Sequence, residues 1–374
     1  MKKLLLLALC ALLAANAGAR TLYVDASRPN NSGNGLSRAK AKKTIQAAIN
    51  VAQAGDTILV YPGKYAPIKA NNKKIVIKSV SGAAKTMIVK PKVSAGTIAL
   101  AQLGKSWKYT YVSTGGSAGE VKGRTYTASS YPISDGKKTT LAGFLLDGLY
   151  RGGDYVVGVS GGTVKSCTIQ RIGGESDGVP GCAAVYASLT GCKIQSNRYV
   201  GSAFGIVSDC TLHRCKITKN RGWWPNFYWG YSPLFVRSTI VNSLVLSNKF
   251  NDWGFDQSKL VNCTIAENLL IQDYSEDFQF SYGSKYYNCI LRNNRGQYNG
   301  AKKIHNVDSG NTYKYTFKKN PDPKFTASYG LATGSPCIDA GTGTEAILSL
   351  VGAKDLAGNK RVKGKAIDMG CYER

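Results

Sequence analysis

The sequence lacks most of the motifs that define common enzyme classes. Its 374 residues include only two histidines, His213 and His305, and 22 acidic residues against 49 basic ones. It shows no zinc-ligand spacing, no phosphate-binding glycine loop and no serine nucleophile elbow. The sequence therefore excludes the protein classes that these motifs define, namely zinc hydrolases, nucleotide-binding proteins with a phosphate-binding loop, and α/β-hydrolases.

Long apolar runs are also missing beyond the first twenty residues. The chain opens MKKLLLLALCALLAANAGAR, with two lysines, an apolar run and a small-residue end. This layout predicts a cleavable signal peptide over residues 1–19 and a mature chain from Arg20. Because a membrane-spanning helix needs about 20 apolar residues, we expect a secreted or cell-surface protein without a transmembrane anchor.

The shortage of acidic residues gives the chain a net charge of +27, and of +25 once Lys2 and Lys3 leave with the signal. Residues 20–92 carry 14 Lys/Arg against 2 Asp/Glu, whereas residues 143–210 carry 5 of each. Outside the cytoplasm such a surplus favours acidic or sulfated polysaccharide over nucleic acid as partner. General solubility and adhesion to anionic envelopes is the alternative explanation.

A repeat occupies the centre of the chain, with a short apolar strand on either side of a cysteine or serine. The aligned position is Cys167, Cys192, Cys215, Ser243, Cys263 and Cys289. Five residues later, all copies but the first have an asparagine: Asn197, Asn220, Asn248, Asn268 and Asn294. Spacings of 25, 23, 28, 20 and 26 residues are typical of a solenoid with loops of varying length.

Short strands joined by corners at this period predict a parallel β-helix, an all-β fold in which equivalent residues stack about 4.8 Å apart. Cysteine suits an inward column because it is small and often buried. Stacked neighbours are too far apart for relaxed disulfides, so we expect free thiols. The asparagines are expected to form a ladder of side-chain amides. The Cys–Asn pair is thus predicted to be architectural.

The open ends of a β-helix need covers. In KTIQAAINVAQAGDTILVYPGKY, residues 43–65, helical spacing precedes a strand, which predicts a helical cap at the amino-terminal end. This stretch, with TLYVDASRPNNSGNG before it, resembles the amino-terminal region of secreted right-handed parallel β-helix proteins of the pectate-lyase-like superfamily, and the resemblance implies that this helix is right-handed too. That group contains polysaccharide lyases, glycoside hydrolases and non-catalytic surface proteins.

The carboxy-terminal motifs carry a second resemblance. GSPCIDAG, residues 334–341, and DLAGNKRVKGKAIDMGCYE, residues 355–373, are similar to the end of β-helix proteins with a choice-of-anchor Q domain. We therefore expect a β-helix over residues 20–333, with an insertion at about 105–140, and a closing segment over 334–374. Since an exported chain permits disulfides, we predict that Cys337 and Cys371 are bonded.

Aromatic residues gather in two gaps between repeats, where rings can stack on sugars. The predicted substrate-binding residues are Trp223, Trp224, Trp229, Tyr231, Trp253 and Phe255. The alternative is that these loops pack their own rings. If the groove holds an acidic glycan, eliminative cleavage needs a base and cations, and the candidate catalytic residues are Lys219, Arg221 and Tyr228.

Carboxylates offer a third chemistry. Hydrolysis of a glycosidic bond needs two facing acids, and Asp252 and Asp256 flank one aromatic gap while Asp273, Glu276 and Asp277 occupy the next. The same groups would suit calcium, although they match no calcium motif of the superfamily residue by residue.

The sequence predicts a monomeric, exported protein that engages acidic or sulfated polysaccharide. It leaves open whether the protein is a polysaccharide lyase, less readily a glycoside hydrolase, or a non-catalytic adhesive protein.

Overall fold

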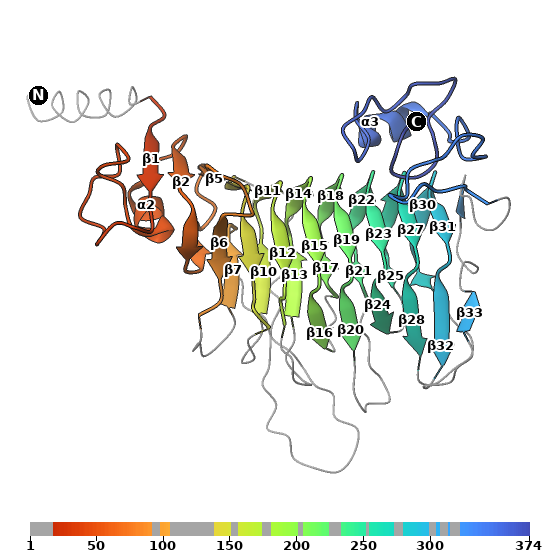
Figure 1. Cartoon of the computed structure of the whole chain (residues 1–374), viewed down its shortest axis with the longest axis horizontal. Coiled ribbons are helices and arrows are strands. Elements are labelled where there is room, and N and C mark those ends of the chain that lie inside the picture. Colours follow the sequence, from red (N-terminus) through yellow and green to blue (C-terminus); the bar gives the residue numbers. More distant parts are fainter. Residues whose placement is uncertain are drawn as a thin grey trace, which may run out of the picture.

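The computed structural model describes residues 18–91, 98–104, 138–150, 156–173, 181–200, 205–223, 233–251, 254–272, 280–298, 304–306, 313–314 and 322–374. Within them, short strands stack into four sheets along one axis, which confirms the predicted parallel β-helix (Figure 1). Among the described strands, all pairs but one are parallel; the exception is the antiparallel pair of β32 and β33.

Within the described residues, the earlier coils pass through three sheets, and the later coils, from residue 188 to residue 282, pass through four. We name the sheets A to D, and D is the sheet to which the earlier described coils contribute no strand. Sheet A contains β1 (Thr21–Val24), β2 (Thr57–Val60), β5 (Val76–Ser79), β8 (Thr140–Ala142), β11 (Thr163–Lys165), β14 (Ser188–Thr190), β18 (Thr211–His213), β22 (Thr239–Val241), β26 (Lys259–Val261), β30 (Lys285–Tyr287) and β34 (Tyr313–Lys314). Sheet B contains β3 (Gly63–Tyr65), β6 (Thr86–Val89), β9 (Leu145–Asp147), β12 (Thr168–Gln170), β15 (Lys193–Gln195), β19 (Lys216–Thr218), β23 (Leu244–Leu246), β27 (Thr264–Ala266) and β31 (Ile290–Arg292).

The remaining strands form the other two sheets. Sheet C contains β4 (Ile68–Lys69), β7 (Ile98–Gln102), β10 (Val156–Ser160), β13 (Gly181–Val185), β17 (Val207–Ser208), β21 (Phe235–Val236), β25 (Phe255–Asp256) and β29 (Ser281–Tyr282). Sheet D contains β16 (Arg198–Val200), β20 (Arg221–Trp223), β24 (Lys249–Asn251), β28 (Leu269–Gln272), β32 (Arg295–Tyr298) and β33 (Ile304–Asn306).

The predicted helical cap is α2 (Ile45–Val51), which lies at the amino-terminal end beside β1 and β2 (Figure 1). Thr44 begins it, because its hydroxyl accepts a hydrogen bond from the backbone N–H of Ala47 at 3.2 Å. Ile45, Ala48 and Ile49 are buried against the first coils. The insertion predicted at about 105–140 lies mostly outside the described residues, and the coils resume at β8 and β9 as expected.

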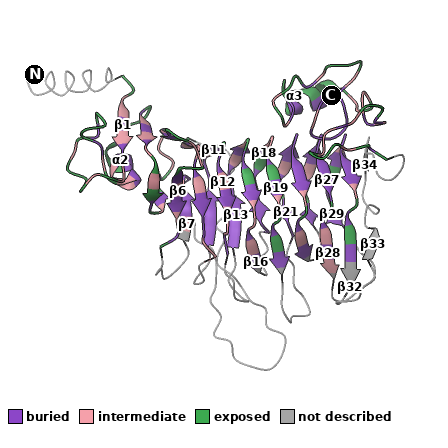
Figure 2. Cartoon of the chain, in the orientation of Figure 1, coloured by how far each residue is buried: buried purple, intermediate pink, exposed green. Residues whose placement is uncertain are grey.

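The interior is built from stacked columns, and buried residues follow the strands along the whole solenoid (Figure 2). The aligned cysteines are buried free thiols, as predicted, and burial raises the pKa of Cys263 well above its ordinary value. Ser243 takes the same place and accepts a hydrogen bond from the backbone N–H of Cys215 at 3.0 Å. Serine can therefore replace cysteine in this column without an unpaired hydroxyl.

The asparagines form the predicted ladder. The Oδ1 atom of Asn220 accepts from both the backbone N–H and the side-chain amide of Asn197, at 3.1 and 2.8 Å. Its own Nδ2 donates to Asn248 Oδ1 at 2.9 Å and to the carbonyl of Ile194 at 2.9 Å. The pattern repeats through Asn268, so each internal rung bonds to the coil on either side.

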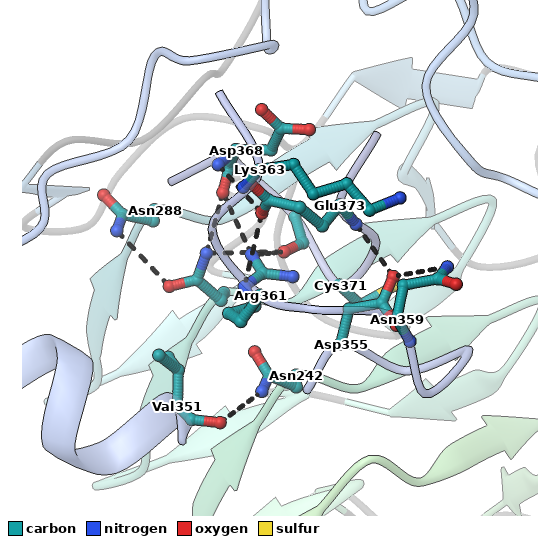
Figure 3. A network of polar contacts seen from close by, with 12 residues as sticks. Asn242, Asn288, Val351, Asp355, Asn359, Arg361, Lys363, Asp368, Cys371 and Glu373 are labelled. Carbon is teal, nitrogen blue, oxygen red and sulfur yellow. Dashed lines mark hydrogen bonds and ion pairs between the residues drawn. The ribbon is translucent and has the colours of Figure 1, made fainter. Parts of the chain in front are cut away.

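The closing segment, residues 334–374, packs along the flank of the later coils and contains α3 (Glu345–Val351) (Figure 1). A second column of asparagines, at the corner between sheets A and B, holds it (Figure 3). Asn242 Nδ2 donates to Val351 O at 2.7 Å, and Asn262 Nδ2 donates to Asp368 O at 2.8 Å. Asn288 Nδ2 donates to Thr342 O at 3.0 Å. All three corner asparagines have positive φ, which asparagine tolerates better than most residues.

Buried charges fix the end of the closing segment (Figure 3). Arg361 is 1% exposed and donates through Nη2 to the carbonyls of Asp368 and Gly370. Its Nε lies 3.7 Å from Glu373 Oε2. Burial, with Asp368 nearby, raises the pKa of Glu373 to about 7, although Arg361 opposes the shift.

The disulfide predicted between Cys337 and Cys371 is wrong. Both are buried free thiols. Cys337 packs in a small apolar cluster with Ile290 and Met369, whereas the backbone N–H of Cys371 donates to Thr264 Oγ1 at 3.2 Å. Hydrogen bonds to the corner column, rather than a covalent bond, hold this segment on the solenoid.

Candidate polyanion-binding face

Four cations lie in one line across the strands of sheet D. Arg198 pairs in register with Arg221, and Arg221 with Lys249. The next coil has Leu269 in this place, and the line resumes at Arg295. Neighbouring strands of a sheet lie about 4.8 Å apart, so the solenoid brings basic residues that are distant in sequence into one column of positive charge, interrupted only at Leu269.

The asparagine ladder positions this column, because each member directly follows a ladder asparagine. The backbone N–H groups of Arg221 and Lys249 donate to the carbonyls of Asn197 and Asn220, both at 2.8 Å. Side chains of a strand alternate between its faces, and Phe250, directly after Lys249, is fully buried. The cations therefore lie on the outer face of sheet D, where Arg221 and Arg295 are exposed and Arg198 and Lys249 are half-buried.

Lys249 has the most unusual electrostatic environment of the line. Partial burial and the neighbouring charge of Arg221 lower the pKa of its ammonium group. Both causes disfavour the charged form, so Lys249 exists as the neutral amine more readily than an exposed lysine. A lysine of this kind can act as a base. Lys219 was the only lysine among the candidate catalytic residues predicted from the sequence.

Arg198 is oriented by an aromatic ring from an earlier coil. Its guanidinium carbon lies 4.5 Å from the ring centroid of Tyr150. The Tyr150 hydroxyl in turn donates to the carbonyl of Ser196. This cation–π contact holds the planar guanidinium group at one end of the line.

The structure describes two of the three predicted catalytic residues, Lys219 and Arg221, and their catalytic roles stay predictions. Arg221 belongs to the line, but Lys219 is an exposed residue with φ of 56° at the corner between sheets B and D. In the same corner column Glu267 stands two residues before Leu269, so the coil that lacks a cation also carries a carboxylate. That carboxylate accepts from the Tyr329 hydroxyl and helps raise the pKa of Tyr329, already raised by burial, to about 12.

Most of the predicted aromatic groove is not described by the structure. Five predicted residues lie outside the described residues: Trp224, Tyr228, Trp229, Tyr231 and Trp253. The backbone of Trp223 ends β20 on sheet D, but its side chain is not described. These residues remain predictions.

Phe255 is a correction. It was expected to face a ligand, but it is fully buried and stacks on Phe235 with ring centroids 5.4 Å apart. The error has a simple cause: Phe255 does not belong to the preceding loop, because it begins β25 and points into the core beside Phe235 of β21. No face of its ring is left for a sugar.

The carboxylate predictions receive little support. Asp256 is 7% exposed on sheet C, while Asp252, Asp273, Glu276 and Asp277 lie outside the described residues. Among the residues that the structure describes, no group of three His, Cys, Asp or Glu could hold a metal ion. Calcium and a hydrolytic acid pair therefore stay predictions from the sequence. Within the same residues, no helix is long and apolar enough to cross a membrane.

The missed residues, Arg198, Lys249 and Arg295, had a signal in the sequence. The dipeptides Asn197-Arg198, Asn220-Arg221, Asn248-Lys249 and Asn294-Arg295 repeat with the ladder. Reading one position beyond the repeated asparagine would have found the line.

Family models and curated proteins gave no match to this chain. Several solved structures are similar to it. A pectate lyase is 16% identical, with 96% of this chain and 97% of that chain covered and a TM-score of 0.45. A rhamnogalacturonan lyase is 12% identical, with 81% and 85% covered and a TM-score of 0.40. A mannuronan C-5 epimerase module from Azotobacter vinelandii is 12% identical, with 72% and 94% covered and a TM-score of 0.30. At identities this low, the roles of individual residues depend on the geometry of this chain.

Proposed function

We propose that this protein is exported and binds an acidic polysaccharide whose chain lies across sheet D, along the solenoid axis. The line of Arg198, Arg221, Lys249 and Arg295 is the observation that supports this best. A polymer with regularly spaced carboxylates or sulfates can meet cations about 4.8 Å apart, with one position of the line left uncharged at Leu269. Arginine adds planar, two-point hydrogen bonding to such groups.

The same face has the groups that eliminative cleavage of a uronate polymer requires. Lys249, in its amine form, would take the proton from the carbon next to the sugar carboxylate. The electron pair left behind forms a carbon–carbon double bond as the bond to the glycosidic oxygen breaks. That oxygen takes a proton from water, and Lys249 later returns its proton to the solvent. Arg221, beside Lys249, would stabilise the negative charge that develops on the carboxylate.

A panel of glycans tests binding and cleavage together. Polygalacturonate, alginate, hyaluronate and heparin would be incubated with the protein, and absorbance of the unsaturated sugar ends would be followed. We expect one uronate polymer to yield unsaturated products. The absence of both binding and products across the panel would contradict the proposal.

Lys249→Arg separates catalysis from attraction, because it keeps the positive charge but removes a usable base. Cleavage should fall at least about 100-fold, a typical contribution of a general base, while binding of the same glycan is retained. Lys285→Arg, on the exposed face of sheet A, is the matched control and should leave both unchanged. Equal loss of cleavage in the two variants would exclude Lys249 as the base.

A non-catalytic adhesive role is the second candidate, and one observation favours it. The amino-terminal coils carry exposed lysines outside sheet D, namely Lys64, Lys69, Lys74, Lys78 and Lys85. These would attach the protein to an anionic matrix, and the likeness of the closing segment to choice-of-anchor Q segments agrees with retention at a surface. Salt-sensitive binding without unsaturated products would favour this role.

A further inference from the structure

The first turn of the described chain contains a backbone contact that depends on where the mature protein begins. The backbone N–H of Arg20 donates to Asp56 Oδ1 at 2.9 Å. The guanidinium group of the same residue contacts the other oxygen, with Nη2 2.7 Å from Asp56 Oδ2. One carboxylate therefore receives both the main chain and the side chain of Arg20.

The buried carboxylate of Asp56 lies where it can bind a positively charged group. It is 1% exposed, and it also accepts the backbone N–H of Gln53 at 2.8 Å. Burial alone would raise the pKa of Asp56, but the hydrogen bonds from Arg20 and Gln53 hold it below its ordinary value. A buried carboxylate that stays ionised needs charged or strongly polar partners.

The peptide bond before Arg20 is accessible. Gly18 and Ala19 are exposed, whereas Arg20 is half-buried and β1 begins one residue later at Thr21. The small residues Ala17, Gly18 and Ala19 also match the cleavage end of the predicted signal peptide. The boundary between exposed and anchored chain thus coincides with the predicted cleavage point.

We propose that hydrolysis of the Ala19–Arg20 bond creates an α-ammonium group that Asp56 receives, so that removal of the leader strengthens the amino-terminal cap. Water supplies hydroxide to the Ala19 carbonyl carbon and a proton to the Arg20 nitrogen, which binds one further proton at neutral pH. A neutral amide donor then becomes a charged one on the same carboxylate. This inference depends on the proposed export, but not on glycan binding.

The consequence is local stability at the edge of sheet A. The carbonyl of Arg20 accepts from Thr57 N at 2.9 Å, and its Nη2 also donates to Val51 O at the end of α2. Arg20 therefore joins β1, β2 and α2 at one point. Charge-assisted hydrogen bonds are about twice as strong as neutral ones, so cleavage should tighten the strand that covers the open end of the solenoid.

Two other cations act at this point and oppose the new charge. One is the guanidinium group of Arg20 itself. The other is Lys73, whose Nζ donates to Ile49 O at 2.7 Å and to Ala52 O at 3.2 Å, both at the end of α2. The change in local stability on cleavage is therefore the attraction of the new α-ammonium group to Asp56 minus its repulsion by these two cations.

The test compares the full mature chain from Arg20 with a free amine against the same chain with the amine acetylated. Amide hydrogen exchange in β1 should be about tenfold slower with the free amine at pH 6.5, where that amine is charged. The difference should disappear in Asp56→Asn and should shrink as pH rises past the amine's pKa. Asp25→Asn, a half-buried loop carboxylate that accepts from Ser27, is the control and should preserve the difference.

Amino-terminal sequencing of the exported protein is the second measurement, and it separates the two premises. A product that begins at another residue would refute the cleavage site. A product that begins at Arg20, but whose exchange in β1 is unaffected by acetylation, would refute the role of Asp56 alone. Neither outcome bears on whether sheet D binds a glycan.

Discussion

Two columns of side chains lie one residue apart on the same coils and differ in both direction and role. The ladder from Asn197 to Asn294 points inward and completes its hydrogen bonds between neighbouring coils. The adjoining line on sheet D points outward and places like charges side by side, and partial burial together with the charge of Arg221 lowers the pKa of Lys249. One repeat can therefore place a stabilising asparagine at one position and a cation that attracts a ligand at the next.

The largest expected effect comes from removing a ladder rung. Asn220→Ala would leave two buried donors of Asn197 without their acceptor and would remove a donor to Ile194 O. Each unsatisfied group costs about 1–3 kcal/mol, so we expect the free energy of unfolding in guanidinium chloride to fall by about 3–4 kcal/mol. Ser247→Ala, at an exposed corner, should change little, and equal effects would remove the distinction between buried and exposed positions.

A pH effect should appear outside the solenoid, in the closing segment. The folded pKa of Glu373 is about 7, above the ordinary unfolded value of about 4.3. The folded segment therefore binds more protons between these values, so its stability is full below about pH 4 and falls as pH rises through 7, by about 1–3 kcal/mol.

Hydrogen exchange of residues 355–373 at pH 5 and pH 8 measures this change. Glu373→Gln should remove the pH dependence, because the amide does not titrate. Unchanged dependence in that variant would mean that another group is responsible.

A smaller loss of stability is expected when an asparagine is removed from the corner column instead of the ladder. Asn262→Ala removes a hydrogen bond of 2.8 Å to Asp368 O, so docking of the closing segment should weaken by about 1–2 kcal/mol. Exchange should rise in residues 355–373 and stay constant in the ladder coils. Uniform loosening of the solenoid would show that the corner and the ladder are one cooperative unit.

These contrasts also show what the sequence alone could predict. The cysteine and asparagine columns were predictable because their partners are copies of themselves, one coil away. The docking of the closing segment was not, because Asn242 lies in the repeat but its partner Val351 is 109 residues away and outside the repeat. Phe255 was misread because sequence does not show where a loop ends and an inward strand begins. The line on sheet D was visible in the repeated Asn-Arg and Asn-Lys pairs but depends on register for its meaning.

The smallest effect on stability should be that of Arg221→Ala, within about 0.5 kcal/mol, since the side chain is exposed. Its effect on glycan binding should nevertheless exceed that of Asn262→Ala. Thermal unfolding and equilibrium binding of these two variants would show whether Arg221→Ala has the smaller effect on stability and the larger effect on binding. A loss of stability in Arg221→Ala as large as that in Asn220→Ala would contradict the separation of the two columns.

The salt dependence of glycan affinity shows whether the cations of sheet D bind the polyanion. Affinity for the best-binding polymer of the panel would be measured from low to physiological salt for the wild-type chain, Arg198→Ala, Arg221→Ala and Lys285→Ala. If the line on sheet D binds the polyanion, each arginine variant should reduce the slope of log affinity against log salt by roughly one, and Lys285→Ala should leave it unchanged. Unaltered slopes in the arginine variants, or an equal reduction in Lys285→Ala, would contradict the account.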